Sequence, residues 1–509
     1  MPITPTYPGL YIEELASSAR TITAAPTSVT VFIGYTHPFK TKAFAKAVQI
    51  FSMTEYEREF GGLYASGVVD SNVPYAVNQF FLNGGSNAYV VGLEPRQRDN
   101  ANANLGPIPK ATVAVGTCIF SALEPTDLVG MNVTIDNLNP ASTIADITVA
   151  YGSRAETFRA VSLDTASPDF IEKRINGLSG LATVAPNPAY GATFTAGSRV
   201  AFTQSMHANF LTSYSPSDFV AAFQADSSLD KVPIFNLMCL PGITDTAVWS
   251  SALNFCEKKH AFAILDPPRQ AAADDSLAPV PKVADAIVAL PKSTNGGLYF
   301  PYLKVADPVT ATTVELPPSG SVAGLYSRID QNRGVWKSPA GLEALLNNVS
   351  GVVDRGVMTE MRHGTLNPMG VNCIRSFPGI GTVVFGARTQ ITENPAFQQW
   401  RYIAVRRTAL FLEQTLLNNL GWVVFEPNDE KLWVSIRTSI ESFMLSLFNQ
   451  GAFQGTKPSQ SFKVICDSTT TTQQDIDNGI VNIVVAFAPL KPAEFVIIKI
   501  AQLAGQTQA

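Results

Sequence analysis

Charged side chains are scarce in this sequence. Asp, Glu, Lys and Arg make up 15% of its 509 residues, whereas about a quarter is usual for globular domains. The 36 basic and 41 acidic residues give a net charge of −5, which excludes the strongly basic balance of proteins that wrap nucleic acid. Hydrophobic residues still reach 46%, so the composition is not that of a disordered chain. The low charge indicates either a neutral polar surface or a surface that a partner covers.

Long hydrophobic runs are also missing. The longest apolar stretch, residues 480–490, is followed by Lys491 and Pro492 and is too short to span a bilayer. The first residues carry Glu13 and Glu14 instead of the basic and then apolar regions of a signal peptide. We therefore expect a protein that is made in the cytoplasm and does not insert into a membrane.

Cysteine and histidine are too few and too scattered for a metal or disulfide framework. The five cysteines lie far apart with no CxxC pair, which predicts buried, reduced thiols. The four histidines are His37, His207, His260 and His363. No HExxH motif and no GxSxG elbow accompanies them, so the sequence predicts no metal site, no cofactor and no catalytic residue.

What the sequence does contain is an alternation of strand and helix patterns. Ser28–Tyr35 and Asn87–Leu93 are predicted buried strands. Ser52–Gly62, with a serine or threonine cap and a terminal glycine, and Asn72–Gly85 are predicted helices between them. Short β-type runs separated by turn residues then fill residues 96–205 and predict a β-rich domain.

A βαβ unit follows in the middle of the chain. Val232–Gly242 is a predicted strand, Thr244–His260 a helix with an Asp or Thr cap, and Ala261–Pro268 a second strand. This order and spacing predict a parallel sheet.

The last part of the chain is rich in helix. Helices are predicted at residues 396–420 and 428–449, and strands at residues 480–490 and 493–503. The second helix carries one apolar stripe at helical spacing, formed by Leu432, Ile436, Ile440, Phe443 and Leu447.

Both chain ends carry apolar strand patterns set apart by prolines, Tyr11–Leu15 and Phe495–Ile500. An exposed strand of this kind invites aggregation unless it has a dedicated partner. Two interpretations remain open: each strand pairs at the edge of its own domain, or each completes the sheet of another copy of the chain. Donation from copy to copy would build rings or an open helix.

Several long segments resemble the contractile tail sheath proteins of phages. The segments are YPGLYIEEL (Tyr7–Leu15), TSVTVFIG (Thr27–Gly34), PPSGSVAGLYSRIDQNRGVWKSPA (Pro317–Ala340), GVNCIRSFPGIGTVVFGART (Gly370–Thr389), WRYIAVRRTALFLEQTL (Trp400–Leu416), VFEPNDEKLW (Val424–Trp433) and DIDNGIVNIVVAFAPLKPAEFVIIKI (Asp475–Ile500). The closing FAPLKPAEFVIIKI is most similar to sheaths of extracellular phage-tail-like injection systems. The β-rich segment matches the family only in patches.

The resemblance implies an α/β multidomain fold. It consists of an α+β core domain built from both chain ends, an inserted β-rich domain and an inserted α/β domain that is subtilisin-like and not catalytic. The implied division is an N-terminal donated arm (1–20), the first part of the core (21–95), the β-rich outer domain (96–205), the subtilisin-like domain (206–345), the second part of the core (346–490) and a C-terminal strand arm (491–509). The inter-subunit strand arms are carried onto Tyr11, Ile12, Glu13, Glu14, Leu15, Phe495, Val496, Ile497, Ile498, Lys499 and Ile500.

The function that the resemblance implies is structural. Such a subunit polymerises in hexameric layers of a helical array around an inner tube and contracts by rearranging its contacts, which drives the tube through a target envelope. Its expected partners are other sheath subunits, the tube protein, and baseplate and terminator proteins, in a phage tail or tail-like particle. We expect Asp429, Glu430 and Lys431 to face the tube. The alternatives are a serine hydrolase that uses the subtilisin-like domain, tested through His207 or His260, and a non-contractile, capsid-like protein.

Overall fold

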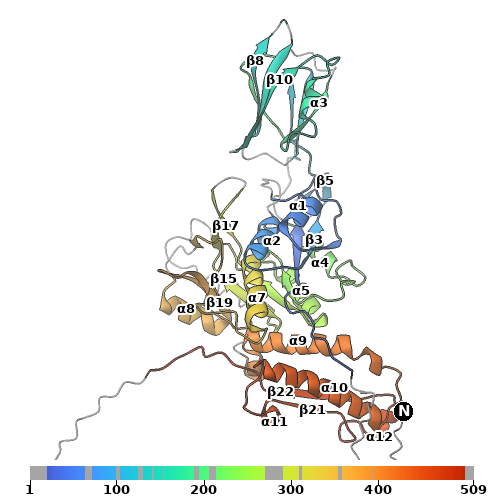
Figure 1. The fold of residues 1–509 in the computed structure, drawn as a ribbon. Coiled ribbons are helices and arrows are strands. Elements are labelled where there is room, and N and C mark those ends of the chain that lie inside the picture. Colours follow the sequence, from blue (N-terminus) through green and yellow to red (C-terminus); the bar gives the residue numbers. More distant parts are fainter. Residues whose placement is uncertain are drawn as a thin grey trace, which may run out of the picture. The chain divides into compact units, whose positions relative to one another are not determined.

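The chain folds into two compact units (Figure 1). The structure is a computed structural model, and it describes residues 20–63, 71–98, 104–123, 130–139, 141, 143–152, 154–187, 194–205, 214–269, 291–308, 312–353, 358–391 and 394–498. The α/β unit comprises Pro26–Asn332 and Pro339–Arg401, and the C-terminal unit comprises Met1–Ala25, Arg333–Ser338 and Tyr402–Ala509.

An eight-stranded sheet forms the centre of the α/β unit, with the order β2-β3-β1-β13-β14-β15-β19-β20. Its strands are β1 (Thr30–Tyr35), β2 (Ala47–Ile50), β3 (Ala88–Leu93), β13 (Leu237–Cys239), β14 (Phe262–Leu265), β15 (Gly296–Phe300), β19 (Val371–Phe377) and β20 (Gly381–Val384). Strands β3 to β19 in that order are parallel, and β2 and β20 are antiparallel edges. The parallel pairing of β13 with β14 confirms the predicted βαβ unit.

Helices cover both faces of this sheet. On one face, Val31 and Ile33 of β1 join a buried cluster with side chains of α4 (Pro216–Ala222) and α5 (Thr246–Lys258). On the other face, the ring of Phe32 lies 5.5 Å from that of Phe80 in α2 (Val73–Leu82). Because side chains alternate along a strand, a strand that is covered on both faces is apolar throughout.

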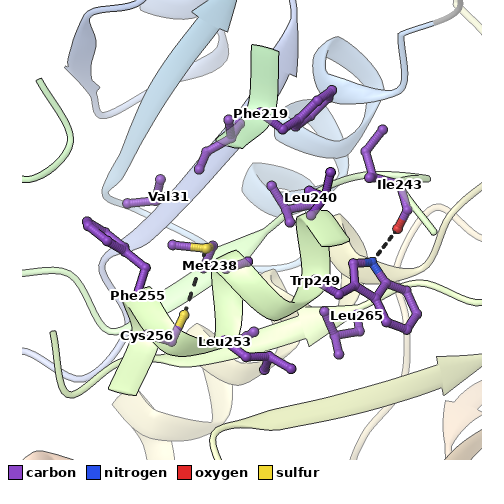
Figure 2. Close-up of a cluster of buried hydrophobic side chains, with 14 of the residues drawn as sticks. Val31, Phe219, Met238, Leu240, Ile243, Trp249, Leu253, Phe255, Cys256 and Leu265 are labelled. Carbon is purple, nitrogen blue, oxygen red and sulfur yellow. Dashed lines mark hydrogen bonds between the residues drawn. The ribbon is translucent and has the colours of Figure 1, made fainter. Parts of the chain in front are cut away.

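Helix α5 shows how local sequence positions this core. The Asp245 side chain accepts hydrogen bonds from the N–H groups of Ala247 and Val248 and so begins the helix, as the predicted cap requires. On the buried side, Trp249 donates its indole N–H to the Ile243 carbonyl at 2.6 Å (Figure 2). All five cysteines of the chain are buried thiols, as expected.

Helix α7 (Ser319–Arg333) was not predicted from periodicity, because residues 319–327 are all buried and leave no alternation of apolar and polar faces. Gly320 and Gly324 face the backbone of α2. A Cβ atom added at Gly320 would lie 2.3 Å from the Ala76 carbonyl oxygen, and one at Gly324 would lie 2.4 Å from that of Phe80. The two helices are therefore in backbone contact at these glycines.

Residues 96–205 form the short strands that the sequence predicts. They are β4 (Arg96–Arg98), β5 (Asn104–Pro107), β6 (Thr112–Val115), β7 (Cys118–Ala122), β8 (Asn132–Asn139), β9 (Ile144–Tyr151), β10 (Arg154–Ser162), β11 (Ala182–Pro186) and β12 (Arg199–Ala201). One sheet has the order β10-β9-β8-β12 and another the order β11-β7-β6. Both sheets, with α3 (Ile171–Ile175), contribute to one hydrophobic cluster, so this segment has a core of its own.

The chain enters and leaves the β-rich segment at a single polar cluster. Arg98 contacts the carboxylate of Asp218 at 2.8 Å. The Tyr35 hydroxyl donates to the same carboxylate at 2.9 Å and accepts the N–H of Ser215 at 3.0 Å. Burial raises the pKa of Tyr35, so its hydroxyl stays a donor.

The remaining elements of the α/β unit are short. They are α1 (Met53–Phe60), β16 (Leu303–Ala306), β17 (Thr313–Leu316), β18 (Gly351–Val352), α8 (Glu360–Leu366) and the 3₁₀ turns η2 (Asn367–Met369) and η3 (Pro395–Trp400). The cap of α1 follows the prediction, since Ser52 accepts the N–H of Glu55 and Gly61 ends the helix with φ +87°.

Two long helices and a small sheet make up the C-terminal unit. Its elements are α9 (Ile403–Asn419), η4 (Gly421–Val423), α10 (Glu430–Asn449), α11 (Pro458–Ser461), β21 (Phe462–Ile465), α12 (Gln473–Asp477) and β22 (Val484–Phe487). The predicted apolar stripe of α10 is buried in the core of this unit, which confirms that prediction.

Three predictions about elements need correction. The helix predicted at residues 396–420 begins only at Ile403, because residues 395–400 form a 3₁₀ turn with non-helical torsions at Phe397. Residues 493–498, part of a predicted strand, have no strand pairing in the structure. The sheet also crosses the predicted boundaries near residues 206 and 346, since β13 to β15 lie between β1 and β19. Parallel strands are joined by crossovers, so neighbours in a sheet can be distant in sequence.

Among the described residues, no helix is both long enough and apolar enough to cross a membrane.

Candidate assembly site

The predicted arm residues are only partly described. Tyr11–Leu15, Lys499 and Ile500 lie outside the described residues, as does His207. Phe495–Ile498 are described, and the site can be built from them and from the small sheet of the C-terminal unit.

That sheet has two strands, β21 and β22, in the part of the chain that the structure describes. They pair antiparallel, with Phe462 opposite Phe487 and Ile465 opposite Val484. The Ala488 N–H donates to the Ser461 carbonyl at 2.8 Å. Because hydrogen-bonded pairs alternate along an antiparallel ladder, the backbone groups of Val485 and Phe487 point away from β21. An isolated two-stranded sheet is marginally stable at best, so this one depends on its packing.

Aromatic packing fixes one face of the small sheet. The ring of Phe453 lies 6.2 Å from that of Phe462 and 5.9 Å from that of Phe487. Val464 and Cys466 are buried in the same cluster as the stripe of α10. Val484, at the start of β22, is 46% exposed. The sheet is thus anchored to the helices, while part of its apolar surface stays open.

The C-terminal segment leaves this sheet as an exposed apolar run. Phe495, Val496, Ile497 and Ile498 are 73%, 79%, 82% and 80% exposed. One contact at its base is a hydrogen bond from the Tyr402 hydroxyl to the Glu494 carboxylate at 3.3 Å. Exposing a large apolar side chain instead of burying it costs about 1.5–3 kcal/mol of free energy. Four such side chains in a row therefore mark an interaction site.

Further apolar side chains of the C-terminal unit are exposed where α9 turns into α10. Val424 is 63% exposed, and Phe425 is fully exposed in a left-handed backbone conformation with φ +71°. A bulky residue rarely adopts positive φ, so this turn presents the phenyl ring at some conformational cost.

The three residues predicted to face a tube begin α10, and all are exposed. Asp429 is the N-cap, since its carboxylate accepts the Leu432 N–H at 2.9 Å. Glu430 lies in the first turn, where a negative charge complements the helix dipole. Asp429 therefore also stabilises the helix. That Asp429, Glu430 and Lys431 face a tube stays a prediction.

A serine–aspartate arrangement that bears on the hydrolase alternative lies at the start of α7. Asp266, just after β14, accepts hydrogen bonds from the Ser319 hydroxyl at 2.7 Å, the Ser319 N–H at 2.8 Å and the Gly242 N–H at 3.0 Å. Burial raises the pKa of Asp266 to about 6, and these donors oppose the rise. A catalytic serine donates its proton to histidine, whereas Ser319 donates to the carboxylate itself. The hydrogen bonds between Ser319 and Asp266 therefore hold the first residue of α7.

His260, one of the two histidines named for the hydrolase test, lies just after α5 in a left-handed backbone conformation with φ +53°. Two other described histidines, His37 and His363, contact neighbouring groups of the α/β unit. His37 is buried, and its Nδ1 accepts the N–H of Phe39 at 3.1 Å and that of Lys40 at 3.3 Å. Burial, reinforced by Lys40, lowers the pKa of His37 to about 3. The His363 ring packs edge-on against Phe385 at 6.1 Å. Across the described ranges, no three His, Cys, Asp or Glu side chains are grouped so as to hold a metal ion.

The geometry described so far defines a class: a mixed α/β protein whose C-terminal unit, over its described residues, has a two-stranded sheet and an exposed apolar run at Phe495–Ile498. Two family models identify this class more specifically. "Phage tail sheath protein central domain" matches residues 217–390 and "Phage tail sheath C-terminal domain" matches residues 396–502. Together they account for more than half of the chain, which belongs to the phage tail sheath family.

Curated relatives agree over parts of their length. The chain is 29% identical over 180 residues to a tail sheath protein of Vibrio phage KVP40, covering 35% of this chain and 25% of that protein. It is 23% identical over 269 residues to a putative prophage major tail sheath protein of Pseudomonas aeruginosa, covering 51% of this chain and 62% of that protein. The chain thus matches less than two thirds of either relative.

Solved structures share the fold over the whole chain. The sheath of the PVC extracellular contractile injection system in its contracted state matches with a TM-score of 0.59 at 22% identity, over 98% of both chains. The helical sheath of the anti-feeding prophage in its contracted state matches with a TM-score of 0.57 at 24% identity, over 98% of this chain and all of that one. A mixed α/β multidomain sheath fold is therefore confirmed.

Proposed function

We propose that this protein is a structural subunit of a contractile sheath, which polymerises around an inner tube and drives it through a target envelope by rearranging contacts between subunits. The observation that carries the proposal is the exposed apolar run Phe495–Ile498, which follows a sheet of two described strands in the sequence. A strand from another copy would cover the apolar side chains and extend the sheet.

The physical logic suits a contractile lattice. A donated strand can keep its backbone hydrogen bonds to the receiving subunit when the two subunits change their relative orientation. The condition is that the tether between the strand and its own subunit can bend. Subunits can then rotate as rigid bodies while the strand contacts persist. The low charge of the sequence fits the same proposal, since charged side chains at buried interfaces are costly to desolvate.

The finer assignments belong to this proposal. The arms are Tyr11–Leu15 and Phe495–Ile500, and the α/β domain is subtilisin-like without catalysis. The subunits would form hexameric layers of a helical array that contacts the tube, a baseplate and a terminator. The subunit would be assembled in the cytoplasm into a phage-tail-like particle. It would need no cofactor, nucleic acid or membrane insertion and would not act as an enzyme.

Truncation of the arms tests the proposal. Deleting residues 493–509, or residues 1–16, should leave a folded protein by circular dichroism that forms no tubes in negative-stain images, because each deletion removes a donated strand. A matched control that deletes only residues 502–509 keeps the apolar run and should polymerise like the full chain. Long tubes from either arm deletion would disprove strand donation, and closed shells from the full chain would favour a capsid-like protein.

A further inference from the structure

Residues 20–25 lie in an extended conformation against the end of α9 and the middle of α10, about four hundred positions away in sequence. The contacting side chains are Thr415, Asn419, Trp422 and Ser439, which we name the root seat. All of them belong to the C-terminal unit. The segment is the first described part of the chain and follows directly on the predicted N-terminal arm.

The root seat holds this segment through its backbone. The Asn419 amide binds Thr23 twice: its oxygen accepts the Thr23 N–H at 2.9 Å, and its nitrogen donates to the Thr23 carbonyl at 2.8 Å. Two such bonds satisfy the same groups that a neighbouring β-strand would satisfy. One side chain thus takes the place of a strand partner.

Two further hydrogen bonds extend the attachment on either side. The Ala25 N–H donates to the Thr415 hydroxyl at 3.1 Å, and the Arg20 N–H donates to the Ser439 hydroxyl at 3.1 Å. Asn419 also donates to the Thr415 carbonyl at 2.8 Å, which fixes the orientation of its amide. The seat is therefore preorganised on the helices before the segment binds.

Apolar and cationic contacts add to these bonds. Ile22 packs against the hydrophobic cluster of the C-terminal unit. The Arg20 guanidinium lies over the Trp422 ring, 4.6 Å from its centroid. A cation over an aromatic face contributes about 0.5–1 kcal/mol at an exposed site. The attachment thus combines several modest contacts along six residues.

We propose that the root seat anchors the base of the N-terminal arm, so that Asn419 is a positioning residue for assembly. This inference rests on the proposed function, because it assumes that the residues before Arg20 bind another copy. With the seat closed, the free part of the arm begins at Arg20. With the seat open, the next hydrogen bond along the chain is the one that the Asn236 amide donates to the Pro26 carbonyl at 2.8 Å. The tether then lengthens by about the six residues 20–25, and the effective concentration of the arm at its target falls.

Asn419→Ala in the full-length chain tests the anchor, and Asn418→Ala is the matched control because Asn418 is the adjacent, exposed asparagine of the same helix. Hydrogen exchange at the Thr23 amide should accelerate by roughly tenfold or more in the first variant, the equivalent of one lost hydrogen bond. Trypsin should cleave after Arg20 faster in the same variant. The protein concentration needed for tube formation should rise by roughly twofold to tenfold, and the control should match the natural protein in all three measurements.

A second variant guards against a general loss of structure. Thr415→Val keeps the shape of the side chain but removes the hydroxyl that binds the Ala25 N–H, and it should produce the same changes to a smaller extent. Unchanged exchange at Thr23 in Asn419→Ala would overturn the seat. Faster exchange with an unchanged concentration for tube formation would overturn its role in positioning. Neither result decides strand donation itself, which is tested separately by the deletions of residues 1–16 and 493–509.

Discussion

The eight-stranded sheet of the α/β unit and the two-stranded sheet of β21 and β22 differ in how far each is covered by the described parts of the chain. In the α/β unit, helices cover both faces of the eight-stranded sheet. The antiparallel strands β2 and β20 form its two edges. In the C-terminal unit, two described strands precede an apolar run that is more than 70% exposed. The larger sheet is buried within its own unit, whereas the smaller one is the sheet that we propose another copy extends. Changes in the first should therefore alter folding, and changes in the second should alter assembly.

The largest effect on stability is expected at the contact between α7 and α2. Gly320→Ala would normally stabilise a helix by about 1 kcal/mol. Here the added Cβ meets the Ala76 backbone at 2.3 Å, so we expect the free energy of unfolding to fall by ~3 kcal/mol. The measurement is a urea unfolding curve.

A glycine in the same unit provides the control for this change. Gly364 lies in α8, and a Cβ added there meets nothing within 4 Å. Gly364→Ala should therefore raise stability slightly. If both alanine variants shift the curve in the same direction, the close approach of α7 to α2 does not determine the packing of the unit.

Acid should act on the α/β unit through two buried groups with opposite effects. His37 has its pKa lowered to about 3, so the folded state binds fewer protons than the unfolded state below the ordinary value of 6.5, and stability falls as the pH drops. Asp266 has its pKa raised to about 6, so the folded state binds more protons between pH 6 and the ordinary value of 3.8, and stability rises as the pH drops. The two contributions partly cancel between pH 6 and 4.

Single substitutions should separate these contributions. His37→Asn keeps an acceptor for the N–H groups of Phe39 and Lys40, and the variant should gain stability on acidification from pH 7 to 4, by on the order of 3 kcal/mol from Asp266. Asp266→Asn should lose stability more steeply than the natural protein over the same range. Parallel curves of unfolding free energy against pH for all three proteins would refute both assignments.

The smallest effect on stability is expected at the start of α10. The triple variant Asp429→Asn, Glu430→Lys and Lys431→Glu keeps a good N-cap and should cost less than ~1 kcal/mol of stability. If these residues face the tube, co-assembly of sheath and tube should nevertheless weaken, as judged by co-sedimentation. Asp429→Ala is the converse control, because it removes the cap and should lower stability by ~1 kcal/mol. Normal co-assembly of the triple variant would place the tube contact elsewhere.

The parts of the fold that could be predicted are those with a strong local pattern. The βαβ unit around α5 follows from two apolar runs and a capped helix between them, and the stripe of α10 follows from helical spacing. Helix α7 was not predicted because its first nine residues are all buried, and small residues there alternate with Val322, Leu325 and Tyr326. A helix that is buried all round shows no amphipathic stripe. The packing of α7 depends on the backbone of α2, which is remote in sequence.

The candidate site likewise has one part that the sequence predicts and one part that it does not. The apolar run Phe495–Ile498 was visible in the sequence, and its exposure agrees with a segment that has no place in its own core. The root seat could not be predicted, since one asparagine at a helix end has no distinctive spacing. The partner of that asparagine, Thr23, is 396 positions away, and only the fold brings them together.

The polar cluster of Tyr35, Arg98 and Asp218 has a consequence for how such a gene can change. The β-rich segment starts and finishes at this one cluster and has its own hydrophobic core. A segment with these properties can be exchanged as a cassette, provided that the new segment keeps the contacts that Ile108 and Lys110 make with the core cluster and with Phe39. Recombination at codons near 98 and 215 could therefore give the same subunit a different outer module without redesigning the rest of the protein.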